Sequence, residues 1–354
     1  MLTKDDAKMS QGIAILAMLM LHLFCRLDNL PYHVHLYVGN TPLIYYFGLF
    51  GDICVPIYCF TSGYAQYVLS EKEQGLYRLE SLCRLGRFLL HFELIVLVFS
   101  VVGVIVGDTS IPGSWDDFWG NVLLYGLSYN GAWWFALTYV FLILLAPLLI
   151  QIVKHVRSCT GVAVFVITSC GYYFISYLFE FSFPMDFSNP ILGWIWRQIL
   201  LLGRTQFPFI LGVLFSRYSI ITELKKVLHN VWIRRIVIIA LPAGMFLFHC
   251  IVQSLIVAPA TAITTLSCFY LWKKPQCVCR FFQFMGRHSM NIWLTHMFFY
   301  MRMFQGLVFI AKEPILILLL MLSICLAVSC GIDWVEACLR RLYTKVYSTV
   351  RFCK

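Results

Sequence analysis

A histidine interrupts an otherwise apolar run near the start of the chain. His22 lies in the stretch LMLHLFCRL at residues 19–27, and His91, His249 and His296 stand in apolar stretches as well. Imidazole titrates near neutral pH, so it can act as a general base toward a hydroxyl or as a nucleophile that carries a transferred group. The alternative is a structural histidine that makes one hydrogen bond between helices. Position alone does not distinguish these histidines.

A carboxylate opens a second unusual stretch, GDICVPIYCFTSGY at residues 51–64. Asp52 is surrounded by apolar residues, and a carboxylate in such surroundings must be paired or protonated. A pairing with His22 would raise the basicity of the imidazole and fix its tautomer, and we hypothesise this dyad. Ser62 and Gly63 in the same stretch either line a cavity or allow close helix packing.

Two arginines stand three residues apart in SLCRLGRFLLHFE, at Arg84 and Arg87. On a helix this spacing places both guanidiniums on one face, where they can bind phosphate groups as paired donors. Ordinary anchoring of a cytoplasmic helix end by basic residues is the alternative. His91 follows one turn later, and we interpret it as a hydrogen-bonded structural histidine.

Two further arginines, Arg197 and Arg204, are seven residues apart in an apolar stretch and so lie on nearly one helix face. Isolated charges are costly in lipid. We therefore expect both to be buried and either to line a polar path or to pair with a carboxylate, for which the candidates are Asp52, Glu93 and Glu180.

The stretch MGRHSMNIWLTHMFF at residues 285–299 carries Ser289, Asn291 and His296. His296 is interpreted as a cavity or hydrogen-bonding residue and ranks below His22 as a candidate for catalysis. Of the cysteines, Cys277 and Cys279 form a lone C-x-C pair without the companion ligands that zinc requires, so we expect no metal site. The outer loops contain no cysteine, which argues against a disulfide framework.

Membrane-spanning helices must position these residues. The chain is 60% hydrophobic and 12% charged, with a mean hydropathy of +0.80, and a helix needs about 20 residues to cross a bilayer core. We predict an all-α polytopic membrane protein with a single domain over residues 1–354, of which about 8–334 form the membrane bundle and 335–354 a short cytoplasmic tail. Ten helices are expected, near residues 8–26, 43–69, 88–107, 132–152, 160–179, 195–215, 235–252, 255–272, 289–309 and 314–334.

Basic residues indicate the orientation. With a cytoplasmic N-terminus, 22 of the 27 Lys and Arg residues fall in inner segments, while the outer loop 108–131 carries three aspartates and no basic residue. Both termini are therefore expected in the cytoplasm. His22 lies roughly 21 Å along the helix from Lys8, in the outer half of the membrane. The net charge of +10 matches anionic lipid and gives no reason to expect a nucleic-acid partner.

Several fragments together resemble the acyltransferase-3 family of integral-membrane acyltransferases over almost the whole chain. They are QGIAILAMLMLHLF at 11–24, VPIYCFTSGY at 55–64, RLGR at 84–87, GAWWFALTYVFLILLAPLL at 131–149, FPFILGVLF at 207–215 and MGRHSMNIWLTHMFF at 285–299. The resemblance implies about ten spans and transfer of an acyl group, usually acetyl, from a cytoplasmic coenzyme A thioester to a hydroxyl of a glycan or glycolipid.

The resemblance also implies roles for residues. His22 corresponds to the family's first-helix histidine and is expected to be catalytic, with Asp52 beside it, while Arg84 and Arg87 match the family's R-x-x-R element and are expected to bind the donor. The family usually carries Arg or Lys eleven positions before the histidine, where this chain has Gln11. Lys8 lies on nearly the same helix face and is a candidate replacement. The cavity residues expected are Ser62, Arg197, Arg204 and His296.

The function expected is O-acyl transfer, with acetyl-CoA or another acyl-CoA as donor and no metal. The acceptor would be a cell-surface polysaccharide or its lipid-linked precursor. The protein would lie in the inner membrane, and its partners would be lipid and polysaccharide-synthesis proteins. Two alternatives remain open. One is a transporter or flippase for a glycan intermediate, and the other is a non-catalytic subunit for glycan export, which the departure at Gln11 keeps in play.

Overall fold

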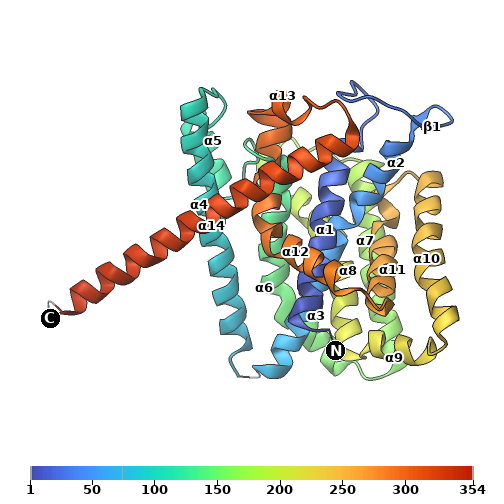
Figure 1. Ribbon diagram of the computed structural model, residues 1–354. Coiled ribbons are helices and arrows are strands. Elements are labelled where there is room, and N and C mark those ends of the chain that lie inside the picture. The colour runs from blue at the N-terminus through green and yellow to red at the C-terminus, as the bar shows by residue number, and fades with distance from the viewer. Residues whose placement is uncertain (1, 74, 353–354) are drawn as a thin grey trace. The chain divides into compact units, whose positions relative to one another are not determined.

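A computed structural model describes residues 2–73 and 75–352 of the chain, with side chains up to residue 341 (Figure 1). The described part is almost entirely helical, and its one sheet is a two-residue hairpin of β1 (Tyr37–Val38) and β2 (Thr41–Pro42). The chain divides into two compact units. The all-α class expected from the sequence is confirmed.

Unit 1 contains residues 1–29, 34–91 and 133–287. Its helices are α1 (Lys4–Phe24), α2 (Leu43–Phe50), the short η1 (Gly51–Ile53), α3 (Cys54–Lys72), the first half of α4 (Tyr77–Val106), α6 (Trp134–His155), α7 (Cys159–Phe181), α8 (Pro190–Arg217), α9 (Ile220–Val227), α10 (Val231–Ile251), η3 (Leu255–Val257), α11 (Ala258–Leu271) and the first half of α12 (Gln276–Met297).

Unit 2 contains residues 30–33, 92–132 and those from 288 onward. It holds the second half of α4, α5 (Trp115–Val122), the end of α12, the π-helical turn η4 (Phe298–Arg302), α13 (Gln305–Val308) and α14 (Pro314–Phe352). The turn η2 (Gly131–Trp133) joins unit 2 to α6. The segment from residue 335, expected as a separate tail, continues the helix α14 to Phe352.

Eight helices in the described chain are long and apolar enough to cross a membrane. The polytopic class is therefore supported, but the expected count of ten is not confirmed. The helix predicted near 255–272 is present as the shorter apolar segment Leu255–Leu271. The helix predicted near 289–309 begins earlier, as α12, and its sequence mixes Arg280, Arg287 and other polar residues with aromatic ones, so it is less apolar than a typical span.

Polar caps set where the membrane helices of unit 1 begin. The hydroxyl of Thr3 accepts from the Asp6 backbone N–H, and the Asp6 carboxylate accepts from that of Thr3, which forms a capping box at α1. Asn189 and Asn230 cap α8 and α10 in a similar way. These caps satisfy the backbone donors that a helix start leaves without partners.

The most extensive helix pairing in unit 1 joins α3 and α8. A Cβ on Gly63 would meet the backbone of Phe209, and a Cβ on Gly212 would meet the backbone of Phe60 and Tyr64. Glycines on both helices therefore let the two backbones approach closely, as in many membrane helix pairs. This close approach fixes the positions of Ser62 on α3 and of the cationic positions on α8.

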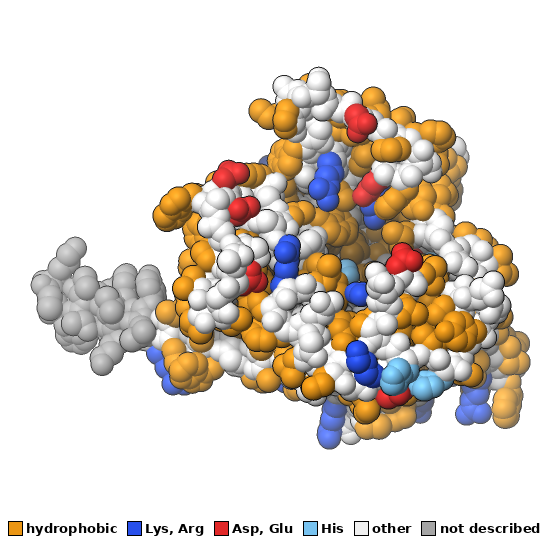
Figure 2. All heavy atoms as spheres, turned by 90° about the horizontal axis from the view of Figure 1, so that it is seen from above, with side chains coloured by type: hydrophobic (Ala, Val, Ile, Leu, Met, Phe, Trp, Pro, Cys, Tyr) orange, Lys and Arg blue, Asp and Glu red, His pale blue; other side chains and the backbone are white. Residues whose placement is uncertain are grey.

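Different elements lie at the two ends of unit 1. In Figure 1, the N-terminus and α9 lie at one end of the unit, and β1 and α2 lie at the other. Large hydrophobic side chains are widely exposed on the described helices. Figure 2, which views the molecule from above, shows orange hydrophobic side chains with only scattered charged ones. Such a surface fits an environment of lipid.

The close approach of α3 and α8 gives a test of stability. Replacing Gly212 by Ala should destabilise the protein by about 1–3 kcal/mol, because the new methyl group would overlap the Phe60 carbonyl. The control is Gly171→Ala on α7, where no atom lies within 4 Å of the added Cβ. Thermal unfolding in detergent measures both, and equal melting temperatures for the two variants would contradict this account of the packing.

Candidate active site

The short helix η1 carries Asp52 into the interior of unit 1, where it meets His249 of α10. Asp52 Oδ1 lies 3.2 Å from His249 Nε2, and the side chains are only 2% and 1% exposed. The ring of Phe50 packs edge-on against the imidazole, with 6.1 Å between ring centroids. A buried carboxylate and imidazole this close form a charged pair that is shielded from solvent. Within the described chain the carboxylate oxygens of Asp52 and the ring nitrogens of His249 have no hydrogen bond, so the attraction between the two groups is electrostatic.

The segment around Asp52 packs along the last turns of α1. A Cβ on Gly51 would meet Ala17 and Leu21, and a Cβ on Gly48 would meet the backbone of Cys25. The charge of Asp52 also acts on the Cys25 thiol. His22 lies three residues before Cys25, in the last turn of α1. Asp52 and His22 therefore lie at a similar depth, as expected.

The ion pair that the structure gives to Asp52 is with His249, however, and not with the His22 of the hypothesised dyad. The sequence shows His249 in an apolar stretch but gives no signal for its partner, because the two residues are separated by almost two hundred positions. The sequence indicates only that His249 lies among apolar residues, where an ionisable side chain is expected to have a polar partner.

A second charged pair lies between α7 and α8, where Arg204 Nη1 donates to Glu180 Oε2. The guanidinium also lies over the rings of Phe181 and Trp134, with 5.0 and 5.8 Å to their centroids. This confirms Glu180, one of the three carboxylates considered, as the partner of Arg204. The charge of the arginine is thus neutralised by a carboxylate and stabilised by aromatic faces.

Tyr173 of α7 is a further buried polar residue of unit 1. Its hydroxyl donates to the carbonyls of Leu255 and Ile256, 3.1 and 3.0 Å away. We call Asp52, His249, Tyr173, Arg204 and Glu180 the polar cluster of unit 1. Sequence reasoning missed Tyr173, because a tyrosine in an aromatic-rich span carries no distinguishing signal.

Arg197 differs from expectation, because its side chain is exposed and not buried. The helix α8 begins at Pro190, so Arg197 stands only two turns from the helix start. A long arginine side chain at that level can extend toward the membrane interface, which removes the need for a buried partner. Because Arg197 is exposed, the structure does not support the prediction that it lines a cavity together with Arg204.

Near its N-terminal end, α1 crosses α12 at two glycines. A Cβ on Gly12 would meet the Phe282 backbone, and a Cβ on Gly286 would meet the Lys8 carbonyl. Lys8 is exposed at this crossing, and Arg287 follows directly after Gly286. One turn further in, the buried Oε1 of Gln11 has no hydrogen-bond donor within the part of the chain that the structure describes. Two cations and an unsatisfied acceptor therefore meet at this crossing.

Arg84 and Arg87 lie on one face of α4, as their spacing predicts. Both approach the same carboxylate: Arg84 Nε is 2.9 Å and Arg87 Nη2 3.7 Å from Glu80 Oε1, and all three side chains are exposed. Ser62 of α3 forms a side-chain hydrogen bond with Tyr139 of α6.

His296 belongs to unit 2, at the end of α12, and is fully buried. Its Nδ1 lies 2.7 Å from the Trp293 carbonyl, and its ring stacks on Tyr300 with 5.8 Å between centroids. The π-helical turn η4 begins two residues later, a feature that is frequent near functional sites. The hydrogen bond and the stacking hold the imidazole in one orientation.

The described residues contain no candidate for a metal site or for a disulfide bond. No group of three or more His, Cys, Asp or Glu side chains among them is placed to hold a metal ion. The described cysteines are free.

Comparison with known proteins addresses the chain as a whole. The family model for the acyltransferase domain matches residues 9–334, nearly its full length. Searches of curated proteins and of solved structures give no match. The matched range includes every candidate site residue except Lys8, which precedes it by one position. The chain belongs to the acyltransferase-3 family and is a multi-pass membrane acyltransferase, which transfers groups other than aminoacyl groups.

Proposed function

We propose that the protein is an O-acyltransferase that moves an acyl group, in the first place acetyl, from acyl-CoA to a hydroxyl of a cell-surface polysaccharide or its lipid-linked precursor. The observation that carries this proposal is the position of His22. It lies in the last turn of α1, at the depth of the buried Asp52, inside a domain that matches the acyltransferase family. Imidazole there can accept a proton from a hydroxyl.

The donor is proposed to bind where basic residues meet on helices of unit 1. Arg84 and Arg87 share one exposed carboxylate on α4, and Lys8 and Arg287 lie at the crossing of α1 and α12. Coenzyme A carries several phosphates, and guanidinium groups bind phosphate as charged paired donors. The unsatisfied Oε1 of Gln11 can only accept hydrogen bonds. It therefore suits a hydrogen-bonding N–H or O–H group of the bound molecule and not a phosphate.

The proposed orientation follows the basic residues. The end of unit 1 with the N-terminus and α9 (Figure 1) faces the cytoplasm of a cell whose inner membrane holds the protein. Both termini are proposed to be cytoplasmic on the same rule for basic residues. The donor then enters from the cytoplasm. The acceptor reaches His22 from the opposite end, which suits a lipid-linked or exported glycan supplied by polysaccharide-synthesis proteins.

The chemistry proposed uses a few groups. As the acceptor oxygen attacks the thioester carbonyl, its proton passes to the imidazole of His22, and the coenzyme A thiolate leaves and recovers a proton. In the alternative route, the imidazole first takes the acyl group and then gives it to the hydroxyl. The Asp52–His249 pair is proposed to hold η1 against α10, while Gly51 of η1 contacts α1. Arg204 and Ser62 are proposed as residues of the acceptor cavity in unit 1, and His296 is proposed as a polar residue of unit 2.

Loss of His22 should abolish acylation. In a strain that lacks the protein, complementation with His22→Ala should leave surface glycan without ester, because the proton acceptor is gone, whereas wild type should restore it. NMR of purified glycan measures the ester content. The matched control is His155→Ala, an exposed histidine at the end of α6.

Membrane levels of the variants must be equal in that comparison. Persistence of ester with His22→Ala would overturn the catalytic role of this residue. Unchanged ester together with reduced glycan export in the deletion strain would instead support the transporter alternative, and unchanged ester with normal export would contradict both.

Removal of the guanidiniums should weaken donor binding. Arg84→Ala and Arg87→Ala are each expected to raise the KM for acyl-CoA about tenfold, since charge-assisted hydrogen bonds contribute roughly 1.5–3 kcal/mol. Glu80→Gln should lower that KM, because the carboxylate competes with phosphate for the same groups. Initial rates in membranes at varied donor concentration measure the effect.

Arg78→Ala is the control for this experiment, because Arg78 is an exposed arginine of the same helix without an ion pair in the described chain. An increase in KM with Arg78→Ala as large as with Arg84→Ala would show that general surface charge, and not the paired site, attracts the donor.

A further inference from the structure

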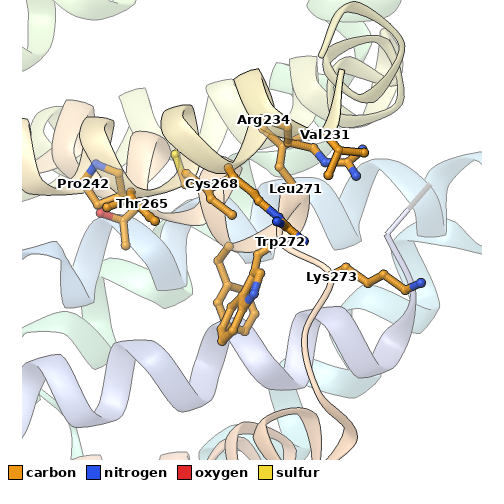
Figure 3. A pocket seen from close by; sticks show the side chains of 12 residues that line it. Val231, Arg234, Pro242, Thr265, Cys268, Leu271, Trp272 and Lys273 are labelled. Atoms are coloured by element: carbon orange, nitrogen blue, oxygen red, sulfur yellow. The ribbon is translucent and has the colours of Figure 1, made fainter. Parts of the chain in front are cut away.

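A groove between α10 and α11 lies outside the candidate active site. It encloses about 640 Å³ and belongs entirely to unit 1. Its walls are mainly apolar, with Ile238, Ile239 and Pro242 contributed by α10 and Cys268 and Leu271 by α11. Figure 3 shows these side chains and the basic ones that accompany them. The groove faces away from the core, since α10 exposes most of its apolar side chains.

The charge in this groove is one-sided. Arg234, Arg235 and Lys273 line it, no Asp or Glu does, and none of the three has an ion pair with a described carboxylate. In Figure 3, Arg234 and Lys273 lie toward one end, while Pro242 and Thr265 lie toward the other. The groove therefore has a cationic mouth and an apolar interior.

The mouth coincides with the ends of two helices. The helix α10 begins at Val231 and α11 ends at Leu271, so the basic residues stand at the level where membrane helices meet the interface. From Arg235 to Pro242 the helix rises about 10 Å. A molecule that fits this profile has a phosphate at the interface and a hydrocarbon chain directed into the membrane.

Two polar features stand inside the apolar part. The buried Oγ1 of Thr265 has no hydrogen-bond partner among the residues that the structure describes. Pro242 has no backbone N–H, so it cannot donate to the carbonyl of Ile238, one turn earlier on the groove wall. An acceptor for the threonine hydroxyl, such as an ester carbonyl below a phosphate, would satisfy Thr265.

We propose that the groove is a specific site for an anionic glycerophospholipid. The phosphate binds Arg234, Arg235 and Lys273, the ester region contacts Thr265, and one acyl chain lies along Ile239 and Pro242. Charge complementarity selects the anionic lipid over a zwitterionic one, because the mouth carries three cations and no carboxylate. This inference does not depend on the identity of the acyl donor or acceptor.

The test measures lipid retained by the full-length protein. Protein purified from nanodiscs of equal parts dioleoylphosphatidylglycerol and dioleoylphosphatidylethanolamine is examined by native mass spectrometry. Wild type should retain phosphatidylglycerol preferentially. The triple variant Arg234→Gln/Arg235→Gln/Lys273→Gln should lose at least about tenfold of that retention. The variant Thr265→Phe, which fills the groove without changing charge, should lose it as well.

The control removes the same charge elsewhere. Lys72→Gln/Arg78→Gln/Arg157→Gln alters three exposed cations that do not line the groove, and it should retain lipid as wild type does. Equal loss in this control would overturn the proposal in favour of diffuse attraction to anionic membranes. Matched thermal unfolding of all variants shows that loss of lipid is not loss of fold.

Three other results would also overturn the proposal. Retention that is unchanged in the triple and Thr265→Phe variants would place the lipid elsewhere. Displacement of the lipid by millimolar inorganic phosphate alone would indicate a site for soluble anions. A dimer mass that disappears with the Thr265→Phe variant would make the groove an interface between two copies of this chain.

Discussion

The cost of placing a charge among apolar side chains shapes two central contacts of unit 1. An uncompensated ion inside a membrane protein is costly, so a charge at depth persists only with a partner. Asp52 meets His249 from a distant helix, and Arg204 meets Glu180 and two aromatic rings. Each pair joins different elements, so charge neutralisation and helix arrangement are fixed together.

Close backbone approach makes these pairings possible. Glycines at 63 and 212 bring α3 against α8, and Gly51 lets the Asp52 segment contact α1 below His22. Small residues at such crossings allow van der Waals contact that larger side chains would prevent. Asp52 and His22 thus lie at a similar depth because of a glycine that has no chemistry of its own. Function here depends on packing as much as on reactive groups.

Sequence reasoning recovered the elements better than their contacts. The apolar runs correctly placed the spans, because hydropathy and length directly reflect the cost of burying backbone in lipid. The count of ten is not confirmed, because α12 is amphipathic and the segment Leu255–Leu271 is shorter than a typical span. Glu180 was among the expected partners of Arg204, whereas only the structure shows that His249 is the partner of Asp52. Arg197 proved exposed, since sequence does not show how far a side chain extends.

The most direct test of this account is a double-mutant cycle on the buried pair. Asp52→Leu and His249→Leu alone should each cost about 3–5 kcal/mol of stability, because each leaves one polar group buried without its partner. The double variant Asp52→Leu/His249→Leu should recover most of that loss, as measured by thermal unfolding in detergent. If the two losses simply add, the residues do not act as a pair, and the account of charge pairing at membrane depth is wrong.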